Sequence, residues 1–260
     1  MFLSADIVGA TAFKESTQVR DETPAWPAAF ETFFRELPLV LMGQVAMAFS
    51  EADRVPELGV WKVIGDEMVF RALPRSAEEA LLLTEAFYRS VIDYDSRVPE
   101  RWPLRLRGCC WAARIGERNI EIEIPEMAGA GHTHGGTYVD YLGPDVDAGF
   151  RLIERVGVGH VIVSLNLAEA LAPVADHAGL RFHYVGEEVL KGVYRGRPYP
   201  MLLISFADRM PDPPRREEES LQYAPRDGSP MAPRELIELG QRTREDLKRT
   251  SGLDLAPLEF

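Results

Sequence analysis

The chain has 260 residues, of which 46% are hydrophobic and 27% are charged, so it can bury an ordinary core and suits one globular domain plus an appendage. Its formal net charge of -12 argues against nucleic acid as a partner, because binding to phosphates depends on an excess of Lys and Arg. No apolar stretch reaches the length of a membrane span, and strand-like residues begin at position 2, which leaves no room for a signal peptide. We therefore expect a cytoplasmic protein, with the adjacent Cys109 and Cys110 as buried thiols on opposite faces of a strand.

Two strand-like stretches in the first third of the chain each end in a carboxylate. Residues 2–8 form an apolar run of β-formers that carries Asp6 and is closed by Gly9. Residues 58–64 form a second run, and Gly65-Asp66 has the composition of a two-residue hairpin turn. A single aspartate at a strand end is ordinarily a turn or cap residue. Two of them on rigid strands, beside a turn with Gly and Thr, suit two divalent cations held over a triphosphate.

Two amphipathic helices are predicted in the first hundred residues. Residues 14–23 are polar, and apolar side chains then recur at helical spacing from residue 26 up to Pro38. Ser76 and Glu79 form the pattern of a capping box, which opens a second helix with its apolar stripe on one face. We expect this second helix to end near Arg97.

The middle of the chain is predicted to be strands separated by glycine turns. Strands are expected over residues 104–112, 119–124 and 138–142. The glycine-rich stretch before the last of them carries His132 and His134. Because two histidines without a Cys or a further His nearby make a poor metal site, we interpret this stretch as an exposed hairpin tip.

The second half of the chain is predicted to complete the sheet and then to change character. Helices are expected over residues 145–156 and 165–178, and strands over residues 160–163, 181–185, 189–194 and 199–206. Pro, Arg and Glu dominate the stretch that follows, which is typical of a solvated linker. The predicted organisation is a globular domain over residues 1–207, a linker over 208–232, and a C-terminal helix with its tail over 233–260.

The two aspartate motifs together resemble those of the class III nucleotidyl cyclase family. In that family a strand ending in Asp-Ile-x-Gly-x-Thr, here Asp6 to Thr11, and a hairpin bearing Gly-Asp supply two metal-binding aspartates. The resemblance implies that Asp6 and Asp66 hold two Mn²⁺ or Mg²⁺ ions, with the Ile7 carbonyl completing the shell. It also implies that the turn after the first strand contacts the substrate triphosphate, through Val8, Gly9 and Thr11.

Three later motifs resemble the same family in the same order. Arg107 lies in the strand where the family places a phosphate-contacting arginine. Lys191 lies where the family has a hairpin near the end of the domain with a lysine that contacts the triphosphate. Between them, residues 138–151 resemble a strand, turn and helix in which an acid, a glycine, an asparagine and an arginine fall at fixed offsets. The acid, glycine and arginine match, as Asp140, Gly143 and Arg151, whereas Asp147 replaces the asparagine. Elsewhere an arginine such as Arg151 would be an ordinary solvated helix residue, but its offset from the glycine favours a catalytic role.

The motifs leave two candidates for the base of the substrate. Lys62 and Asp140 occupy the positions that read the base in this family, and a Lys with an Asp there is the adenine-type pair, which indicates ATP. Asp147, followed by Gly149-Phe150-Arg151, instead resembles the divergent pyrimidine cyclases of bacterial antiphage (Pycsar) systems. We favour UTP over CTP as the substrate, with an adenylate cyclase as the alternative.

The resemblance implies an α+β fold with a mostly antiparallel, ferredoxin-like βαββαβ sheet of class III cyclase type. We expect helices on one face of the sheet and an extended hairpin arm around residues 115–140. In the family, the active sites lie across a homodimer. Asp6, Asp66 and Arg107 would then come from one subunit, and Lys62, Asp140, Asp147, Arg151 and Lys191 from the other.

The resemblance also defines the partners and the rival functions. The substrate would be a nucleoside triphosphate, and a separate cyclic-nucleotide-binding effector would read the product. One rival is a catalytically silent cyclase-like domain that binds a nucleotide as a sensor, although a binding module has no need of the full set of metal acids and cations. A diguanylate cyclase would share the core fold, but its Gly-Gly-Asp/Glu-Glu-Phe signature is absent from the sequence.

Overall fold

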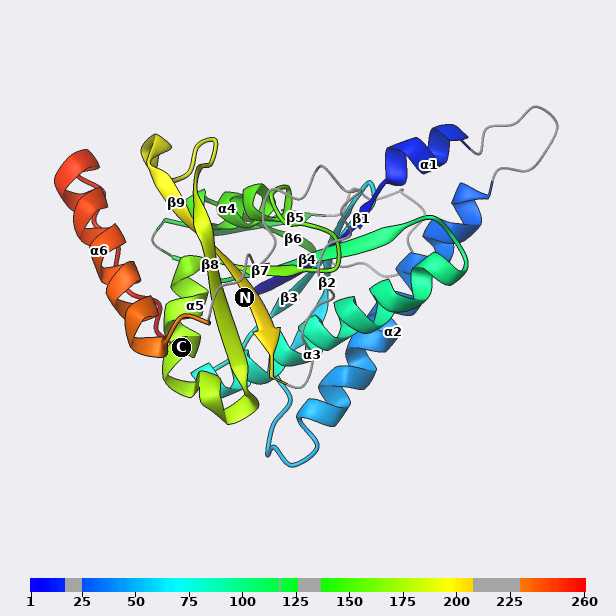
Figure 1. Cartoon of the computed structure of the whole chain (residues 1–260), viewed down its shortest axis with the longest axis horizontal. Helices are drawn as coiled ribbons and strands as arrows, with labels where there is room; N and C mark the ends of the chain where they lie inside the picture. The colour runs from blue at the N-terminus through cyan, green and yellow to red at the C-terminus, as the bar shows by residue number, and fades with distance from the viewer. Residues whose placement is uncertain (17–24, 117, 126–136, 208–229) are drawn as a thin grey trace.

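The computed structural model describes residues 1–16, 25–116, 118–125, 137–207 and 230–260. Its centre is a seven-stranded sheet in the order β2-β3-β1-β4-β7-β9-β8, beside a separate two-stranded ribbon of β5 and β6 (Figure 1). Only β4 and β7 pair in parallel, and every other neighbouring pair is antiparallel. The strands are β1 (Phe2–Val8), β2 (Leu58–Ile64), β3 (Glu67–Ala72), β4 (Arg105–Trp111), β5 (Ile120–Pro125), β6 (Thr137–Leu142), β7 (Val161–Val163), β8 (Leu180–Val189) and β9 (Pro198–Phe206). The predicted α+β class with a mostly antiparallel sheet is confirmed.

Helices cover both faces of the sheet, so the expectation that they lie on one face is wrong. A Cβ atom added to Gly108 of β4 would lie 3.1 Å from Phe87, whereas one added to Gly149 would lie 2.1 Å from Trp111 of β4. Positions 108 and 111 point to opposite sides of the strand, so α3 and α4 pack on opposite faces. The helices are α1 (Ala10–Ser16), α2 (Trp26–Ala48), α3 (Ala77–Arg97), α4 (Pro144–Ile153), α5 (Leu165–Leu171) and α6 (Pro233–Ser251). Short 3₁₀ turns follow as η1 (Val98–Glu100), η2 (Ala172–Ala178) and η3 (Tyr194–Gly196).

The two early helices differ in how well their ends were predicted. The predicted N-cap is confirmed, because the Ser76 hydroxyl accepts a hydrogen bond from the Glu79 backbone N–H at 3.2 Å, and α3 ends at Arg97 as expected. The Glu79 carboxylate accepts from the Arg75 N–H at 2.7 Å, one residue before the position that a full capping box requires. The predicted stop of α2 at Pro38 is wrong, since the helix continues to Ala48. Proline removes one helical hydrogen bond, but the buried stripe of α2 continues beyond it through Leu41 and Val45. Burial of that stripe outweighs the missing bond.

The structure between β8 and β9 also departs from prediction. Residues 189–194 were expected to form a strand, yet β8 ends at Val189 and the chain then turns through Gly192, whose φ is +78°. Leu190 and Val193 are buried in this turn. They produce an apolar pattern like that of a strand without pairing to one. The predicted glycine-rich hairpin tip and most of the linker lie outside the described residues.

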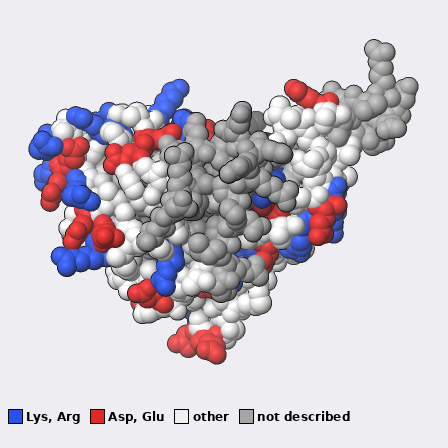
Figure 2. Space-filling model, viewed as in Figure 1, with Lys and Arg blue, Asp and Glu red and all other residues white. Residues whose placement is uncertain are grey.

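The C-terminal helix is present and packs beside α5 (Figure 1). Its inner face buries Leu236, Leu239 and Leu247. Its outer face carries ion pairs between Arg234 and Glu238 and between Arg249 and Asp246. Figure 2 shows Lys, Arg, Asp and Glu interspersed over that side of the molecule. Among the described helices, none is long and apolar enough to cross a bilayer.

Candidate functional site

The predicted metal acid Asp6 lies on the inner strand β1, between two charged neighbours. In the sheet register, Asp6 is opposite Glu67 of β3 on one side and Arg107 of β4 on the other. Cross-strand neighbours of this kind are in side-chain contact. Arg107 donates a hydrogen bond from Nε to Asp6 Oδ2 at 2.7 Å, and a terminal nitrogen lies 2.7 Å from the same oxygen as an ion pair. Both side chains are largely buried, with 23% of Arg107 and 13% of Asp6 exposed.

The second predicted acid, Asp66, is brought to the same end of the sheet by the β2–β3 turn. Gly65 takes a φ of +66°, which lets the turn close, and the Asp66 carbonyl accepts a hydrogen bond from the Ile7 N–H at 3.3 Å. Burial raises the pKa of Asp6, Arg107 opposes this rise, and the negative charge of Asp66 adds to it. The hydrogen bond from Ile7 to Asp66 therefore places the turn beside the residue that follows Asp6.

A third carboxylate, Glu67, joins this end of the sheet and was not predicted. It accepts a hydrogen bond from the Ser4 hydroxyl at 2.5 Å. Burial raises the pKa of Glu67 to about 7, the Ser4 hydrogen bond opposes the rise, and the charges of Asp6 and Asp66 add to it. The sequence shows an acid directly after Asp66, but only the register of β1 against β3 places it beside Asp6.

The oxygen ligands at this end of the sheet fit a hard divalent cation. Asp6 and Asp66 offer carboxylates, and Ile7, whose N–H donates to the Asp66 carbonyl, adds a backbone carbonyl. Over the residues that the structure describes, no group of three or more His, Cys, Asp or Glu side chains is arranged to hold a metal ion. Two carboxylates and a carbonyl therefore need further oxygens, which phosphate and water can supply.

A second group of predicted residues forms around Lys62 and Asp140. A bulge in β2 at Val60/Lys62 lets consecutive residues reach the β5–β6 ribbon. Lys62 Nζ lies 2.6 Å from Asp140 Oδ1, and the indole N–H of Trp61 donates to the Val139 carbonyl at 3.2 Å. Asp140 Oδ1 also accepts from the Tyr141 N–H at 2.8 Å, which leaves Oδ2 as the available acceptor.

A cluster of aromatic rings holds this second group against α4. Trp61 lies 4.9 Å from Phe2, 5.4 Å from Tyr141 and 6.1 Å from Phe150 between ring centroids. Phe150 in turn lies 5.6 Å from Trp111. Such ring pairs add stability beyond their buried area. The cluster therefore connects β2 and β6, which carry the Lys62–Asp140 pair, to the helix that carries Arg151.

Helix α4 presents Asp147 and Arg151 four residues apart on one face. Gly143 precedes the helix at φ +148°, where a Cβ would lie 2.4 Å from Asn119 Oδ1, so this position requires glycine. Asp147 is exposed, whereas Arg151 is 40% exposed and pairs with Glu154 at 3.5 Å. The Glu154 carbonyl also accepts from Arg107 at 3.3 Å, which ties the end of α4 to the Asp6 group.

The remaining predicted residues lie apart from these two groups. Val8 is half-buried, and Gly9 and Thr11 are exposed where β1 passes into α1. Lys191 is exposed in the turn after β8. β2 and β8 are the two outer strands of the sheet, so Lys62 and Lys191 belong to elements at opposite edges.

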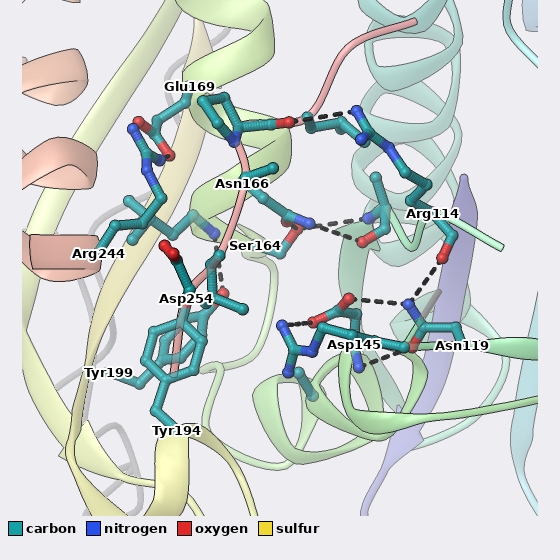
Figure 3. Close-up of a pocket in the computed structure, with 18 residues that line it drawn as sticks. Arg114, Asn119, Asp145, Ser164, Asn166, Glu169, Tyr194, Tyr199, Arg244 and Asp254 are labelled. Carbon is teal, nitrogen blue, oxygen red and sulfur yellow. Dashed lines mark hydrogen bonds and ion pairs between the residues drawn. The ribbon is translucent and has the colours of Figure 1, made fainter. Parts of the chain in front are cut away.

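A polar cavity of about 90 Å³ lies elsewhere, between α4, α5, α6 and the C-terminal tail (Figure 3). None of the predicted site residues lines it. Its three acids are already paired: Asp145 with Arg118 at 3.3 Å, Glu169 with Arg244, and Asp254 with Lys248 at 2.7 Å. We interpret this cavity as the junction that docks α6 on the domain.

Comparison with known proteins identifies the fold. No model of a known family matches the sequence, and no curated protein matches it. Among solved structures, the chain is similar to the adenylyl cyclase CyaB from P. aeruginosa, with a TM-score of 0.56 and 15% identity over 79% of this chain and 93% of that one. It is also similar to the guanylate cyclase domain of RhGC from Catenaria anguillulae, with a TM-score of 0.48 and 12% identity over 79% and 94%. The first likeness confirms the predicted class III cyclase fold.

Proposed function

We propose that the protein is a nucleotidyl cyclase, which converts a ribonucleoside triphosphate into a 3′,5′-cyclic mononucleotide and pyrophosphate. The observation that carries this proposal is that Asp6 and the Asp66 turn lie at one end of a cyclase-type sheet, where Arg107 of the neighbouring strand pairs with Asp6. Cyclisation requires the ribose 3′-oxygen to attack the α-phosphorus while pyrophosphate leaves. The protein must therefore position the triphosphate and neutralise its charge.

Asp6, Asp66 and the Ile7 carbonyl would hold two Mn²⁺ or Mg²⁺ ions. When bound, such ions stabilise phosphate charge and make a hydroxyl a better nucleophile. Arg107, Arg151 and Lys191 would meet the negative charge on the α-phosphate and the leaving group. Val8, Gly9 and Thr11 would lie beside the triphosphate, and Asp147 would contact the ribose.

We further propose that the active site is shared between two copies of the chain. Within one chain, Asp6 pairs with Arg107 in the main sheet, whereas Lys62 pairs with Asp140 of the β5–β6 ribbon, so the metal-binding acids and the base-reading pair form separate groups. The ribbon face that carries Asp140 also exposes apolar side chains: Ile120 at 50%, Ile124 at 45%, Tyr138 at 40% and Leu142 at 46%. A second copy would cover this face. Asp6, Asp66 and Arg107 would then meet Lys62, Asp140, Asp147, Arg151 and Lys191 of the other copy.

For the base, we propose a pyrimidine and favour UTP. Asp147 and the Gly149-Phe150-Arg151 run support this choice, as in the resemblance to the antiphage pyrimidine cyclases. The product would then act as a messenger for a separate effector. ATP is the second candidate. Asp140 can accept a hydrogen bond from either adenine or uracil, and Lys62 can donate one to either base.

The test is to incubate the purified protein with Mn²⁺ and each of the four ribonucleoside triphosphates and to identify the products by mass. We expect cyclic UMP and pyrophosphate. Equal or faster turnover of ATP would overturn the pyrimidine assignment and retain the cyclase. Nucleotide binding without any cyclic product would favour the silent sensor.

A further inference from the structure

We propose that Arg107 is a gate on the metal-binding acids: it occupies Asp6 until a triphosphate draws it away, so that cation and substrate bind cooperatively. This inference rests on the proposed function, because it takes Asp6 as a metal ligand and Arg107 as a triphosphate contact. The new element is that binding of the cation and binding of the nucleotide depend on each other. Neither the cation alone nor the metal-free nucleotide alone should bind at full strength.

The geometry of Arg107 supports the gate. Its Nε donates to Asp6 Oδ2 at 2.7 Å, and one terminal nitrogen forms an ion pair with the same oxygen at 2.7 Å. Its other terminal nitrogen donates to the Glu154 carbonyl at 3.3 Å. Arg107 and Asp6 are register partners on adjacent strands, so the backbone itself places the two groups together. The bond is thus a preformed feature of the fold.

The charges around Asp6 explain why this contact controls cation binding. Asp66 adds negative charge near Asp6, Glu67 lies opposite Asp6 in the sheet register, and Arg107 is in direct contact with Asp6. A divalent ion at Asp6 would lie close to a guanidinium of like charge, which weakens its binding. A triphosphate carries several negative charges and accepts the planar fork of an arginine in a bidentate manner. It can therefore compete with one carboxylate for Arg107 and leave Asp6 free for the ion.

The chain offers a matched control two residues earlier on the same strand. Arg105 donates to Asp95 of α3, from Nε at 3.0 Å and from a terminal nitrogen at 2.8 Å. Asp95 also accepts from the Leu106 N–H at 2.6 Å, so this pair fastens α3 to β4. Arg105→Gln removes the same charge from β4 as Arg107→Gln but leaves Asp6 and its partner in place.

The experiment measures binding of Mn²⁺ alone, without nucleotide, from the electron paramagnetic resonance signal of the free ion. Arg107→Gln should bind Mn²⁺ about tenfold more tightly than the parent protein, a typical coupling between neighbouring sites. Arg105→Gln should stay within about twofold, as expected for a charge outside the pair. Arg107→Lys retains the charge but not the fork, so its gain should be smaller. It also serves if the glutamine variant does not fold.

Adding Asp6→Asn separates failure of the gate from failure of the proposed function. If Mn²⁺ binding is lost with Asp6→Asn but is equal in the parent protein and Arg107→Gln, the gate is wrong and the metal site stands. If no variant shows Mn²⁺ binding that depends on Asp6, both proposals fail.

A reciprocal measurement tests the nucleotide side of the gate. In EDTA, metal-free UTP should bind more tightly to Asp6→Asn, because Arg107 is released from its carboxylate. That gain should shrink when Arg107→Gln is added, as a double-mutant cycle shows directly. An equal gain in both backgrounds would mean that Asp6 acts only by repelling the phosphates, and it would overturn the gate.

Discussion

Two arginine–carboxylate pairs in this molecule are buried to similar degrees but stand in different surroundings. Asp6–Arg107 has 13% and 23% of its side chains exposed, and Glu169–Arg244 has 9% and 17%. Around Asp6, two further acids share one arginine. At Glu169 the charges balance one to one, and Gly240 lets α6 lie directly against the carboxylate. Burial therefore does not separate the pair that we propose as functional from the structural one, whereas the further acids beside Asp6 do.

The largest expected effect comes from removing an acid of the unbalanced group. Asp6→Ala or Asp66→Ala should reduce turnover by several orders of magnitude, because the ions that we propose at these acids would supply most of the charge stabilisation. Asp66 lies in the β2–β3 turn, so Asp66→Ala should fold normally, whereas Asp6→Ala leaves the largely buried Arg107 without its carboxylate and should lower the melting temperature without unfolding the protein. Pyrophosphate release and a thermal melt measure the two properties. Retention of more than a few percent of the activity, read as a free energy, would mean that the metal site is misplaced.

The balanced pair should respond in stability and not in chemistry. Arg244→Leu leaves Glu169 as a largely buried carboxylate without its partner, and burial already raises the pKa of Glu169. Breaking such a pair costs about 2 to 4 kcal/mol of unfolding free energy, allowing for its partial exposure. Urea unfolding measures the loss. Turnover per folded molecule should stay within about twofold of the parent, as is usual for sites remote from the chemistry, and a larger fall would contradict the structural role.

A smaller effect should appear in the pH dependence of stability of the metal-free protein. Burial raises the pKa of Glu67 from 4.5 to about 7, so the folded state binds a proton that the unfolded state has released between these values. Stability should therefore fall as pH rises from about 5 to about 8, by roughly 1 to 2 kcal/mol after allowing for partial exposure. Urea unfolding in EDTA should show this slope in the parent protein and a flatter one in Glu67→Gln. Equal slopes would contradict the assignment.

The sequence was informative where one short motif determines both structure and chemistry. Asp6 could be found because it interrupts an apolar strand-like run near its end, and Asp66 because it follows a second run in a turn. The Ser76 cap could be found because its pattern is local. Glu67 was missed because its place beside Asp6 depends on strand register, which a single sequence does not reveal.

The errors in the fold have a related physical origin. The strand expected over residues 189–194 rested on buried residues that pack within a turn, and the stop at Pro38 rested on a local penalty that tertiary packing overrides. The position of α4 on the second face depended on Gly149 meeting Trp111, a contact between distant segments.

A purified heterodimer of Asp6→Ala and Arg151→Ala chains tests whether two copies of the chain share each cyclase site. Each variant alone should be inactive. In the heterodimer, one site carries both lesions and the other carries none, so pyrophosphate release should recover to about half of the parent value by two-fold symmetry. A heterodimer of Asp6→Ala and Asp66→Ala chains is the matched control, and it should stay inactive because each site still lacks one acid. No recovery in a verified Asp6→Ala/Arg151→Ala heterodimer would contradict the shared site and the assignment of these residues to opposite copies.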